Sequence, residues 1–206
     1  MERFIFDLDG TLLDLDFSYE DVFFEEQLGE ELGKQFNKVK VDLLDQYEFS
    51  HKNYDVDLLS EFLSMKSGID ITPKLIDEWI FFNSTVEDRV HDGVYEVLDY
   101  LKSKGKSIAL LTNWFSKTQI ERLRKAGIYE YFDDICCGET FIKPYYKSYI
   151  NACGNYDIKD SIMIGDNLDK DVLAPRNIGM ASIHYNNKEK VDDSTIKSLR
   201  KIKEMF

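Results

Sequence analysis

The chain has 206 residues, of which 43% are hydrophobic and 14% are aromatic, so its composition is that of a folded globular protein and excludes a disordered chain. Its formal net charge of −13 argues against a nucleic-acid binder, because a phosphate backbone is bound through a basic surface. No apolar stretch approaches the ~20 residues that a membrane-spanning helix needs, so we expect no membrane partner either.

The three cysteines and three histidines predict neither a disulfide framework nor a zinc site. The cysteines, Cys136, Cys137 and Cys153, are odd in number and two of them are adjacent, which favours reduced thiols. The histidines lie far apart in the sequence, so they give a zinc site little support. The N-terminus lacks the basic and apolar regions of a secretion signal. We expect a cytoplasmic protein that is a monomer or a weak homodimer.

The first predicted element is a short strand at 4–6, which leads directly into Asp7 and Asp9. Such a short apolar run is typical of a strand that is buried on both faces of a parallel sheet. In open α/β sheets, ligands bind beyond the carboxyl ends of the strands, where the two carboxylates would lie. Gly10 allows the backbone to turn sharply and to approach a ligand closely.

Residues 15–89 carry a helical pattern and contain no convincing strand. The predicted helices begin near Ser18, cover 35–48, run from Asp55 to a stop at Gly68, and open at Thr72-Pro73. We interpret this block as an all-helical insertion.

From about residue 93, strands alternate with helices, which is typical of βαβ units in a parallel sheet. The predicted strands are 107–111, 135–137, 161–164 and 180–184. The predicted helices are 94–104, 116–127, 146–153, a segment from Asp166 to Gly179, and 194–205. Ser116-x-x-Gln119 matches a capping box at the start of its helix. The sequence therefore predicts a parallel α/β core that a helical insertion splits.

Polar residues follow several of the predicted core strands, and parallel strands bring their carboxyl ends to one edge of the sheet. These residues are Asp7, Asp9, Thr112, Asn113, Lys143, Asp166 and Asp171. Carboxylates that lie so close raise one another's pKa unless a cation intervenes. Oxygen ligands suit Mg²⁺, and a substrate phosphate would complete the coordination of the ion. One carboxylate can then attack phosphorus, while a hydroxyl and an ammonium hold the phosphoryl oxygens.

In this order and spacing, the strand-end residues resemble the four motifs of the haloacid dehalogenase superfamily. The motifs are Asp7-x-Asp9-Gly10-Thr11-Leu12, Thr112-Asn113, Lys143-Pro144, and Gly165-Asp166-Asn167-x-x-x-Asp171. The resemblance covers nearly the whole chain, and a helical insertion between the first two motifs resembles the type 1 cap of the superfamily. It implies an α/β fold with a Rossmann-like parallel sheet core and an inserted α-helical cap domain.

The resemblance also implies a role for each motif residue. Asp7 would be the nucleophile and a Mg²⁺ ligand. Asp9 would protonate the leaving alcohol and deprotonate the attacking water, and its backbone carbonyl would bind the metal. The other implied roles are phosphoryl binding by Thr112, neutralisation of Asp7 and phosphate by Lys143, Mg²⁺ binding by Asp166, metal ligation or ligand orientation by Asp171, and phosphate binding by backbone N–H groups around Leu8 and Asn113.

Several alternatives remain open at this point. Lys147 is a rival for the role of Lys143, and Asp169 fits better as an acid in the first turn of a helix. Asp9 favours phosphate-ester hydrolysis over dehalogenation, because an alkoxide needs a proton donor whereas a halide does not. A phosphomutase would share every core residue. A phospho-acceptor module or a binding protein without turnover are alternatives from a different class.

The expected division is a core domain of residues 1–14 and 90–206 and a cap domain of residues 15–89, with hinges at 12–17 and 87–92. A helical lid would exclude water and favour small substrates. Most aromatic residues of the insertion should form its own core, and one or two could stack on a base or a sugar. The candidate substrates are sugar phosphates, phosphoglycolate and nucleoside monophosphates.

Overall fold

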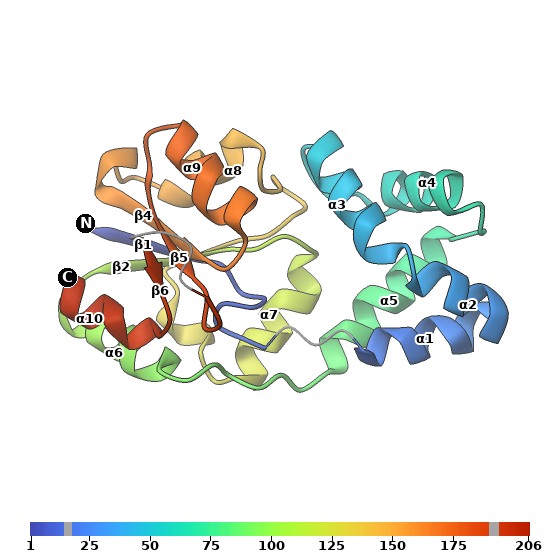
Figure 1. Cartoon of the computed structure of the whole chain (residues 1–206), viewed down its shortest axis with the longest axis horizontal. Coiled ribbons are helices and arrows are strands. Elements are labelled where there is room, and N and C mark those ends of the chain that lie inside the picture. The colour runs from blue at the N-terminus through green and yellow to red at the C-terminus, as the bar shows by residue number, and fades with distance from the viewer. Residues whose placement is uncertain (15–17, 190–193) are drawn as a thin grey trace.

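A single parallel sheet organises most of the chain (Figure 1). The structure, a computed structural model, describes residues 1–14, 18–189 and 194–206. Within these residues, six strands pair in the order β3-β2-β1-β4-β5-β6. The strands are β1 (Arg3–Phe6), β2 (Ser107–Leu111), β3 (Asp134–Cys136), β4 (Ser161–Gly165), β5 (Ala181–Tyr185) and β6 (Thr195–Ile196). The predicted α/β fold with a parallel sheet is confirmed.

The central strand β1 is buried on both faces, as its apolar sequence predicts. Phe4 and Phe6 point to one hydrophobic cluster and Ile5 to another, because successive side chains of a strand face opposite sides. In the register of the sheet, Phe6 lies opposite Leu110 on β2 and Ile164 on β4. This register brings the segments that follow β1, β2 and β4 to the same edge of the sheet.

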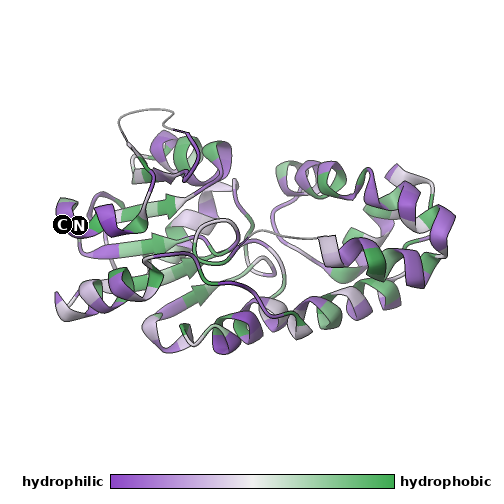
Figure 2. Cartoon of the chain, turned by 60° about the horizontal axis from the view of Figure 1, so that its bottom comes forward, coloured by the Kyte–Doolittle hydropathy of each residue, from purple (hydrophilic) through white to green (hydrophobic). Residues whose placement is uncertain are grey.

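Helices cover both faces of the sheet (Figure 1). On one face lie α6 (Val94–Ser103), α7 (Ser116–Lys125) and α10 (Ile202–Met205), and on the other lie α8 (Tyr146–Cys153) and α9 (Ala174–Asn177). Each face has its own apolar cluster, to which α6 contributes Leu98 and α8 contributes Tyr149. In Figure 2 the strands are mostly hydrophobic, whereas the helices alternate between hydrophobic and hydrophilic residues.

Five described helices form a separate bundle beside the sheet, which we call the helical lobe (Figure 1). They are α1 (Ser18–Leu28), α2 (Glu30–Asn37), α3 (Lys40–Ser50), α4 (Val56–Ser67) and α5 (Pro73–Thr85). Two predicted helix starts are confirmed, since Asp55 caps α4 through its carboxylate and Thr72 caps α5 through its hydroxyl. The predicted stop of α4 at Gly68 is confirmed too, because this glycine is left-handed.

The helical lobe is docked on the loops that follow β2 and β3. Phe115 and Ile142 belong to the apolar cluster of the lobe, although they lie in the sheet domain. Near them, the Thr118 hydroxyl donates to the carbonyl of Ile80 at 2.8 Å, and both groups are buried. The lobe therefore rests on one side of the strand-end crevice through a packed, hydrogen-bonded contact.

The predicted helix at 35–48 is wrong as a single element, since α2 ends at Asn37 and α3 begins at Lys40. Two polar contacts with α1 lie at the break. The Asn37 amide donates to the carbonyl of Asp21 at 2.9 Å, and the buried Lys40 ammonium lies 3.1 Å from Glu20.

The predicted helix at 194–205 is also wrong in its first half. Residues Thr195–Ile196 form the edge strand β6, and a 3₁₀ turn precedes the short α10. The amide of Asn186 donates to the carbonyl of Ile196 at 3.0 Å, so sheet pairing replaces the helical hydrogen bonds. The predicted helix after Asp166 is present, but it opens as a π-helical turn, Leu168–Leu173.

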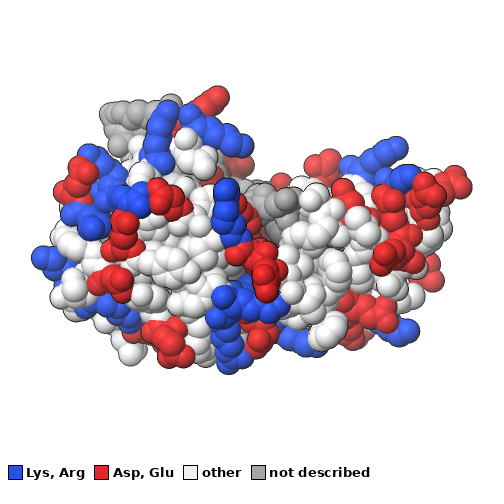
Figure 3. Space-filling view, turned by 90° about the horizontal axis from the view of Figure 1, so that it is seen from below, with Lys and Arg blue, Asp and Glu red and all other residues white. Residues whose placement is uncertain are grey.

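Acidic and basic side chains alternate over the sheet domain on the face seen in Figure 3, whereas acidic ones predominate at the far end of the helical lobe. Among the described residues, no helix combines the length and apolar character that crossing a bilayer would require.

The first predicted hinge, at 12–17, lies in part outside the described residues.

Candidate active site

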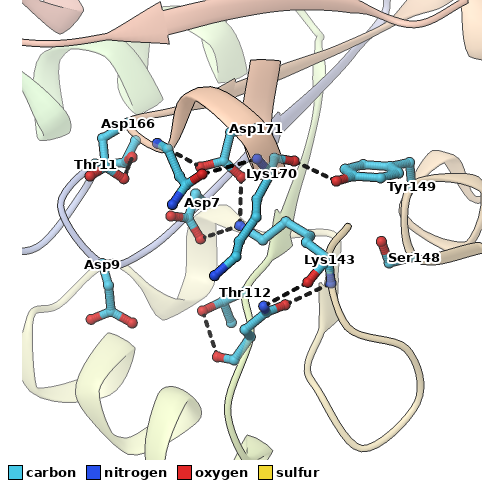
Figure 4. A network of polar contacts seen from close by, with 12 residues as sticks. Asp7, Asp9, Thr11, Thr112, Lys143, Ser148, Tyr149, Asp166, Lys170 and Asp171 are labelled. Carbon is cyan, nitrogen blue, oxygen red and sulfur yellow. Dashed lines mark hydrogen bonds and ion pairs between the residues drawn. The ribbon is translucent and has the colours of Figure 1, made fainter. Parts of the chain in front are cut away.

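The strand-end residues line one cavity of about 250 Å³ between the sheet and the helical lobe. Asp7 and Asp9 follow β1, Thr112 follows β2, and Asp166 and Asp171 follow β4. Asn113 and Lys143 also line this cavity, and the lobe closes it with Asp45, Glu48 and Trp79. The structure thus brings together all the side chains that the sequence predicts for the site, and Figure 4 shows most of them in one close-up.

Lys143 lies at the centre of the site (Figure 4). Its ammonium donates to Asp7 Oδ1 and to Asp171 Oδ1, both at 2.7 Å, and the residue is only 3% exposed. Its backbone is fixed by Asn113, whose side chain accepts from Lys143 N at 2.8 Å and donates to Lys143 O at 3.0 Å. Lys147 is exposed on α8, so it is Lys143 that reaches the carboxylates.

Asp7, Asp166 and Asp171 form a carboxylate cluster that could hold a metal ion. One oxygen of each lies within 4.8 Å of the others. Asp171 is fully buried, and one of its oxygens accepts from the amide of Asn167 at 3.1 Å. Asp166 accepts from the Thr11 hydroxyl at 3.3 Å. A set of hard oxygen donors in this arrangement fits Mg²⁺.

The raised pKa values in the cluster also favour a bound cation. Burial raises the pKa of Asp7 well above its usual range, Lys143 opposes that effect, and repulsion from Asp171 and Asp166 reinforces it. Burial and then repulsion from Asp171 raise the pKa of Asp166 to about 6. One ammonium therefore does not compensate three carboxylates, and a divalent cation would supply the missing positive charge.

Two glycines leave room for these carboxylates. A side chain at Gly10, which has a φ of +76°, would place its Cβ 2.4 Å from Asp166 Oδ2. A Cβ at Gly165 would lie 2.3 Å from Asp171 Oδ2. Any other residue at these positions would displace the acidic side chains, because real Cβ atoms do not approach so closely.

Asp9 faces a different group of residues, on helix α7. Its Oδ1 lies 2.6 Å from the guanidinium of Arg122, and its Oδ2 accepts from the Gln119 amide at 3.0 Å. Arg122 is itself paired with Asp88, at 2.7 Å, and is only 4% exposed. The same Gln119 amide donates to the Thr112 hydroxyl at 2.8 Å. The side chain of Asp9 therefore lines the cavity and is held by α7, while a metal contact through its backbone carbonyl stays a prediction.

Sequence reasoning missed Gln119 and Arg122 as site residues. The predicted capping box at Ser116 is wrong, because the amide and hydroxyl of Ser116 donate to Glu139 instead. Gln119 is fully buried and points into the site. The signal that could have found the pair is its spacing, since residues three apart share one face of a helix.

The lobe side of the cavity holds a second charged group. The ammonium of Lys170 pairs with Asp45 and Glu48 on α3, and Glu48 Oε1 also accepts from the hydroxyl of Tyr54 at 2.7 Å. Tyr149 fixes the backbone of Lys170, because its hydroxyl donates to the Lys170 carbonyl (Figure 4). The ion pairs of Lys170 with Asp45 and Glu48, which join the sheet domain to the helical lobe, were not predicted.

Two indole rings line the cavity as well. Trp79 belongs to the lobe, and Trp114 follows Asn113 with a φ of 85°, which is rare for a bulky residue and marks local strain. Their ring centroids are 4.5 Å apart. As expected for most aromatic residues of the insertion, Phe23, Phe24 and Tyr47 belong to the apolar cluster of the lobe, and so does Trp79.

Comparison with known proteins places this site in a family. The sequence model of the haloacid dehalogenase-like hydrolases matches residues 1–179. The phosphoglycolate phosphatase of Agrobacterium fabrum is 37% identical over 102 residues, which are 47% of this chain and 43% of that protein. The pyrimidine 5′-nucleotidase PynA of Streptococcus pneumoniae is 25% identical over 202 residues, 88% of this chain and 82% of that one. The chain spans only 43% to 62% of the length of the first curated relatives it matches.

The fold agrees with that of a solved relative along its whole length. The putative HAD-hydrolase YfnB from Bacillus subtilis, solved bound to magnesium, superposes with a TM-score of 0.76 at 21% identity. The superposition covers 99% of this chain and 97% of that one. The match of the family's sequence model to residues 1–179, in a chain with this fold, shows that the protein belongs to the haloacid dehalogenase-like hydrolases.

Proposed function

We propose that the protein is a Mg²⁺-dependent phosphatase that hydrolyses small phosphorylated metabolites through an aspartyl-phosphate on Asp7. One observation carries this proposal: the Lys143 ammonium lies 2.7 Å from both Asp7 and Asp171 at the bottom of a cavity that is lined by further carboxylates. An ammonium in that position can neutralise a nucleophilic carboxylate and a phosphoryl group together. The names of the two relatives described above, both phosphatases of small molecules, support the same reaction class.

The chain's own residues would take part in two chemical steps. In the first, an oxygen of Asp7 attacks phosphorus, the bond to the ester oxygen breaks, and that oxygen takes a proton from Asp9. In the second, water attacks phosphorus, gives a proton to Asp9, and the bond to Asp7 breaks. The hydroxyl of Thr112, the amides near Leu8 and Asn113, and Lys143 hold the phosphoryl oxygens.

The metal would be held by Asp7, Asp166 and Asp171, with the backbone carbonyl of Asp9 as a further ligand. Mg²⁺ bound there would offset the negative charge of the carboxylates and of the phosphoryl group, which one ammonium leaves in excess. Gln119 and Arg122 orient the carboxylate of Asp9, because each holds one of its two oxygens.

The helical lobe would act as the cap of this enzyme. We assign residues 15–89 to the cap domain and residues 1–14 and 90–206 to the core, with a hinge at 87–92. A cap that closes on the cavity excludes water and bulky phosphoproteins, so the substrates would be sugar phosphates, phosphoglycolate or nucleoside monophosphates. We expect the enzyme to work in the cytoplasm as a monomer or a weak homodimer.

The test is a panel of small phosphate esters assayed for release of inorganic phosphate with and without Mg²⁺. We expect at least one ester of the proposed classes to be hydrolysed, and chelation of the metal to remove that activity. Phosphate release that depends on an added bisphosphate would favour the phosphomutase. A stable phosphorylated protein without turnover would favour the phospho-acceptor module.

A second prediction concerns pH and the metal. The folded, metal-free protein keeps the proton of Asp166 up to a pKa of about 6, whereas the ordinary value is 3.8. The folded state thus binds more protons than the unfolded chain between these values, and this carboxyl makes the protein less stable as pH rises through that window. Mg²⁺ relieves the repulsion only where the carboxylates are ionised.

We therefore expect added Mg²⁺ to raise Tm more at about pH 7.5 than at about pH 5, measured by calorimetry in matched buffers. Asp166→Asn should reduce this difference, because it removes the titrating carboxyl and a metal ligand. A Mg²⁺-induced rise in Tm that is equal at both pH values would contradict the assignment of the site.

A further inference from the structure

The part of the cavity beyond the phosphate site has a charge pattern that bears on the alcohol half of the substrate. Asp45, Glu48 and Trp79 of the helical lobe form its wall, and Lys170 and Trp114 of the sheet domain face them. An alcohol esterified to a phosphate at Asp7 would have to occupy this space. The inference rests on the proposed function, because it concerns the substrate of the same site.

Every cation that lines the cavity in the described residues is already paired with two carboxylates. Lys143 pairs with Asp7 and Asp171. Lys170 pairs with Asp45 and Glu48. Arg122 pairs with Asp9 and Asp88. No lining cation is therefore left to recognise a second negative charge on the substrate.

The pair of Lys170 and Glu48 would be costly to open. The side chains of both residues are only 11% exposed, and the second oxygen of Glu48 accepts from the Tyr54 hydroxyl at 2.7 Å. A substrate carboxylate that took Lys170 from Glu48 would leave a nearly buried carboxylate without its counter-charge, which is strongly unfavourable. Asp45, whose side chain is 56% exposed, adds a further negative charge at the same place.

Uncharged hydroxyl groups fit this wall better. The carboxylates of Asp45 and Glu48 have lone pairs that can accept hydrogen bonds from hydroxyls without displacing Lys170. Trp114 lines the same cavity, and its buried indole N–H has no hydrogen-bond partner among the described residues. The rings of Trp79 and Trp114 supply apolar surface for the carbon skeleton.

We propose that the enzyme acts on phosphate monoesters of uncharged, hydroxyl-bearing alcohols, and that Asp45 and Glu48, by neutralising Lys170, exclude alcohols that carry a carboxylate. Among the proposed substrate classes this selects nucleoside and sugar monophosphates over phosphoglycolate. Specificity of this kind arises from repulsion as well as attraction. This selectivity would distinguish the chain from the phosphoglycolate phosphatase of Agrobacterium fabrum, despite their sequence similarity.

The test uses two esters of nearly the same size, phosphoglycolate and 2-hydroxyethyl phosphate, which differ in a carboxylate and a hydroxymethyl group. With Mg²⁺ present, we expect kcat/KM of the parent protein to be roughly ten- to hundredfold higher for 2-hydroxyethyl phosphate, since one uncompensated like charge in a partly buried site costs about that factor. Equal values, or a preference for phosphoglycolate, would overturn the proposal.

A double variant, Asp45→Asn with Glu48→Gln, frees Lys170 while the Gln side chain can still bind Tyr54. We expect it to raise the ratio of kcat/KM for phosphoglycolate over 2-hydroxyethyl phosphate by roughly tenfold. Asp42→Asn removes one charge from an exposed position of the same helix and should leave the ratio unchanged. An unchanged ratio in the double variant would show that Asp45 and Glu48 do not exclude the carboxylate.

Dissociation constants of the two esters for the Asp7→Asn protein separate this inference from the proposed function. If no ester of the panel is hydrolysed by the parent but 2-hydroxyethyl phosphate still binds more tightly, the reaction is wrong and the charge selectivity stands. If both are hydrolysed and phosphoglycolate binds as tightly or more tightly, the reaction stands and the selectivity is wrong.

Discussion

Asp7→Asn is expected to lower the rate of phosphate release by about four orders of magnitude or more, as the loss of a nucleophile does in enzymes that form covalent intermediates. The asparagine has nearly the same shape but an amide in place of the attacking carboxylate. It also removes one of the three carboxylates that would bind Mg²⁺. The loss should therefore appear in kcat for every ester, including those with easily displaced leaving groups.

The matched control for this substitution is Asp169→Asn. Asp169 lies only a few residues from the metal-binding cluster in sequence, but it is exposed in the first turn after Asn167 and is not among the residues that line the cavity. Its substitution should change the rate by less than about twofold, since exposed changes away from the site have small effects. Hydrolysis by Asp7→Asn at the rate of the parent would remove Asp7 from the role of nucleophile.

Lys143→Met is expected to lower the free energy of unfolding by about 3–5 kcal/mol in metal-free buffer near neutral pH. The ammonium is the shared counter-charge of Asp7 and Asp171, and all three residues are buried. A methionine fills a similar volume but leaves both carboxylates without their ion pair. Urea unfolding in the presence of EDTA, followed by circular dichroism, measures the difference.

Mg²⁺ should restore part of the lost stability of Lys143→Met, because the cation can offset the same carboxylates, but it should not restore activity. Lys147→Met is the control, since Lys147 is exposed on α8 and should change stability by no more than about 0.5 kcal/mol. A Lys143→Met protein as stable as its parent would show that the ammonium does not compensate the carboxylates.

The sequence was most informative where the chain's local pattern also determines its place in the fold. A buried apolar run at 4–6 predicted a central parallel strand, and the geometry of parallel sheets then placed Asp7, Thr112 and Asp166 at one edge. Asp7, Thr112 and Asp166 come directly after their strands, so the convergence of these three residues needed no knowledge of loop conformations. Lys143 lies in the loop beyond β3 and Asp171 in the helical turn after β4, so their positions do not follow from the sheet alone.

The contacts that the sequence did not predict depend on packing between distant elements. Arg122 meets Asp9 and Asp88 only because α7 packs beside the crevice, and no local pattern encodes that approach. Lys170 meets Glu48 only because the helical lobe docks against the loops after β2 and β3. The capping-box pattern at Ser116 was misleading, since it assigned Gln119 to the helix end and not to the site.

The wrong prediction of a helix over 194–205 has a related cause. The segment 194–205 has a charged, amphipathic pattern that fits a helix, but its first residues extend the sheet at the free edge of β5. Pairing with His184 and burial of Ile196 against the core outweigh the local helical preference. Such pairing with a distant strand is not visible in a helical periodicity.

The most direct measurement of the central claim is the identification of the residue that carries the phosphoryl group during turnover. The protein is mixed with Mg²⁺ and a substrate, quenched in acid after a few milliseconds to seconds, digested and analysed by mass spectrometry. We predict that the mass of one phosphoryl group appears on the peptide that contains Asp7 and is absent when Asp7→Asn is treated in the same way. A phosphoryl group on any other residue, or rapid turnover in which no peptide is ever labelled, would contradict the account.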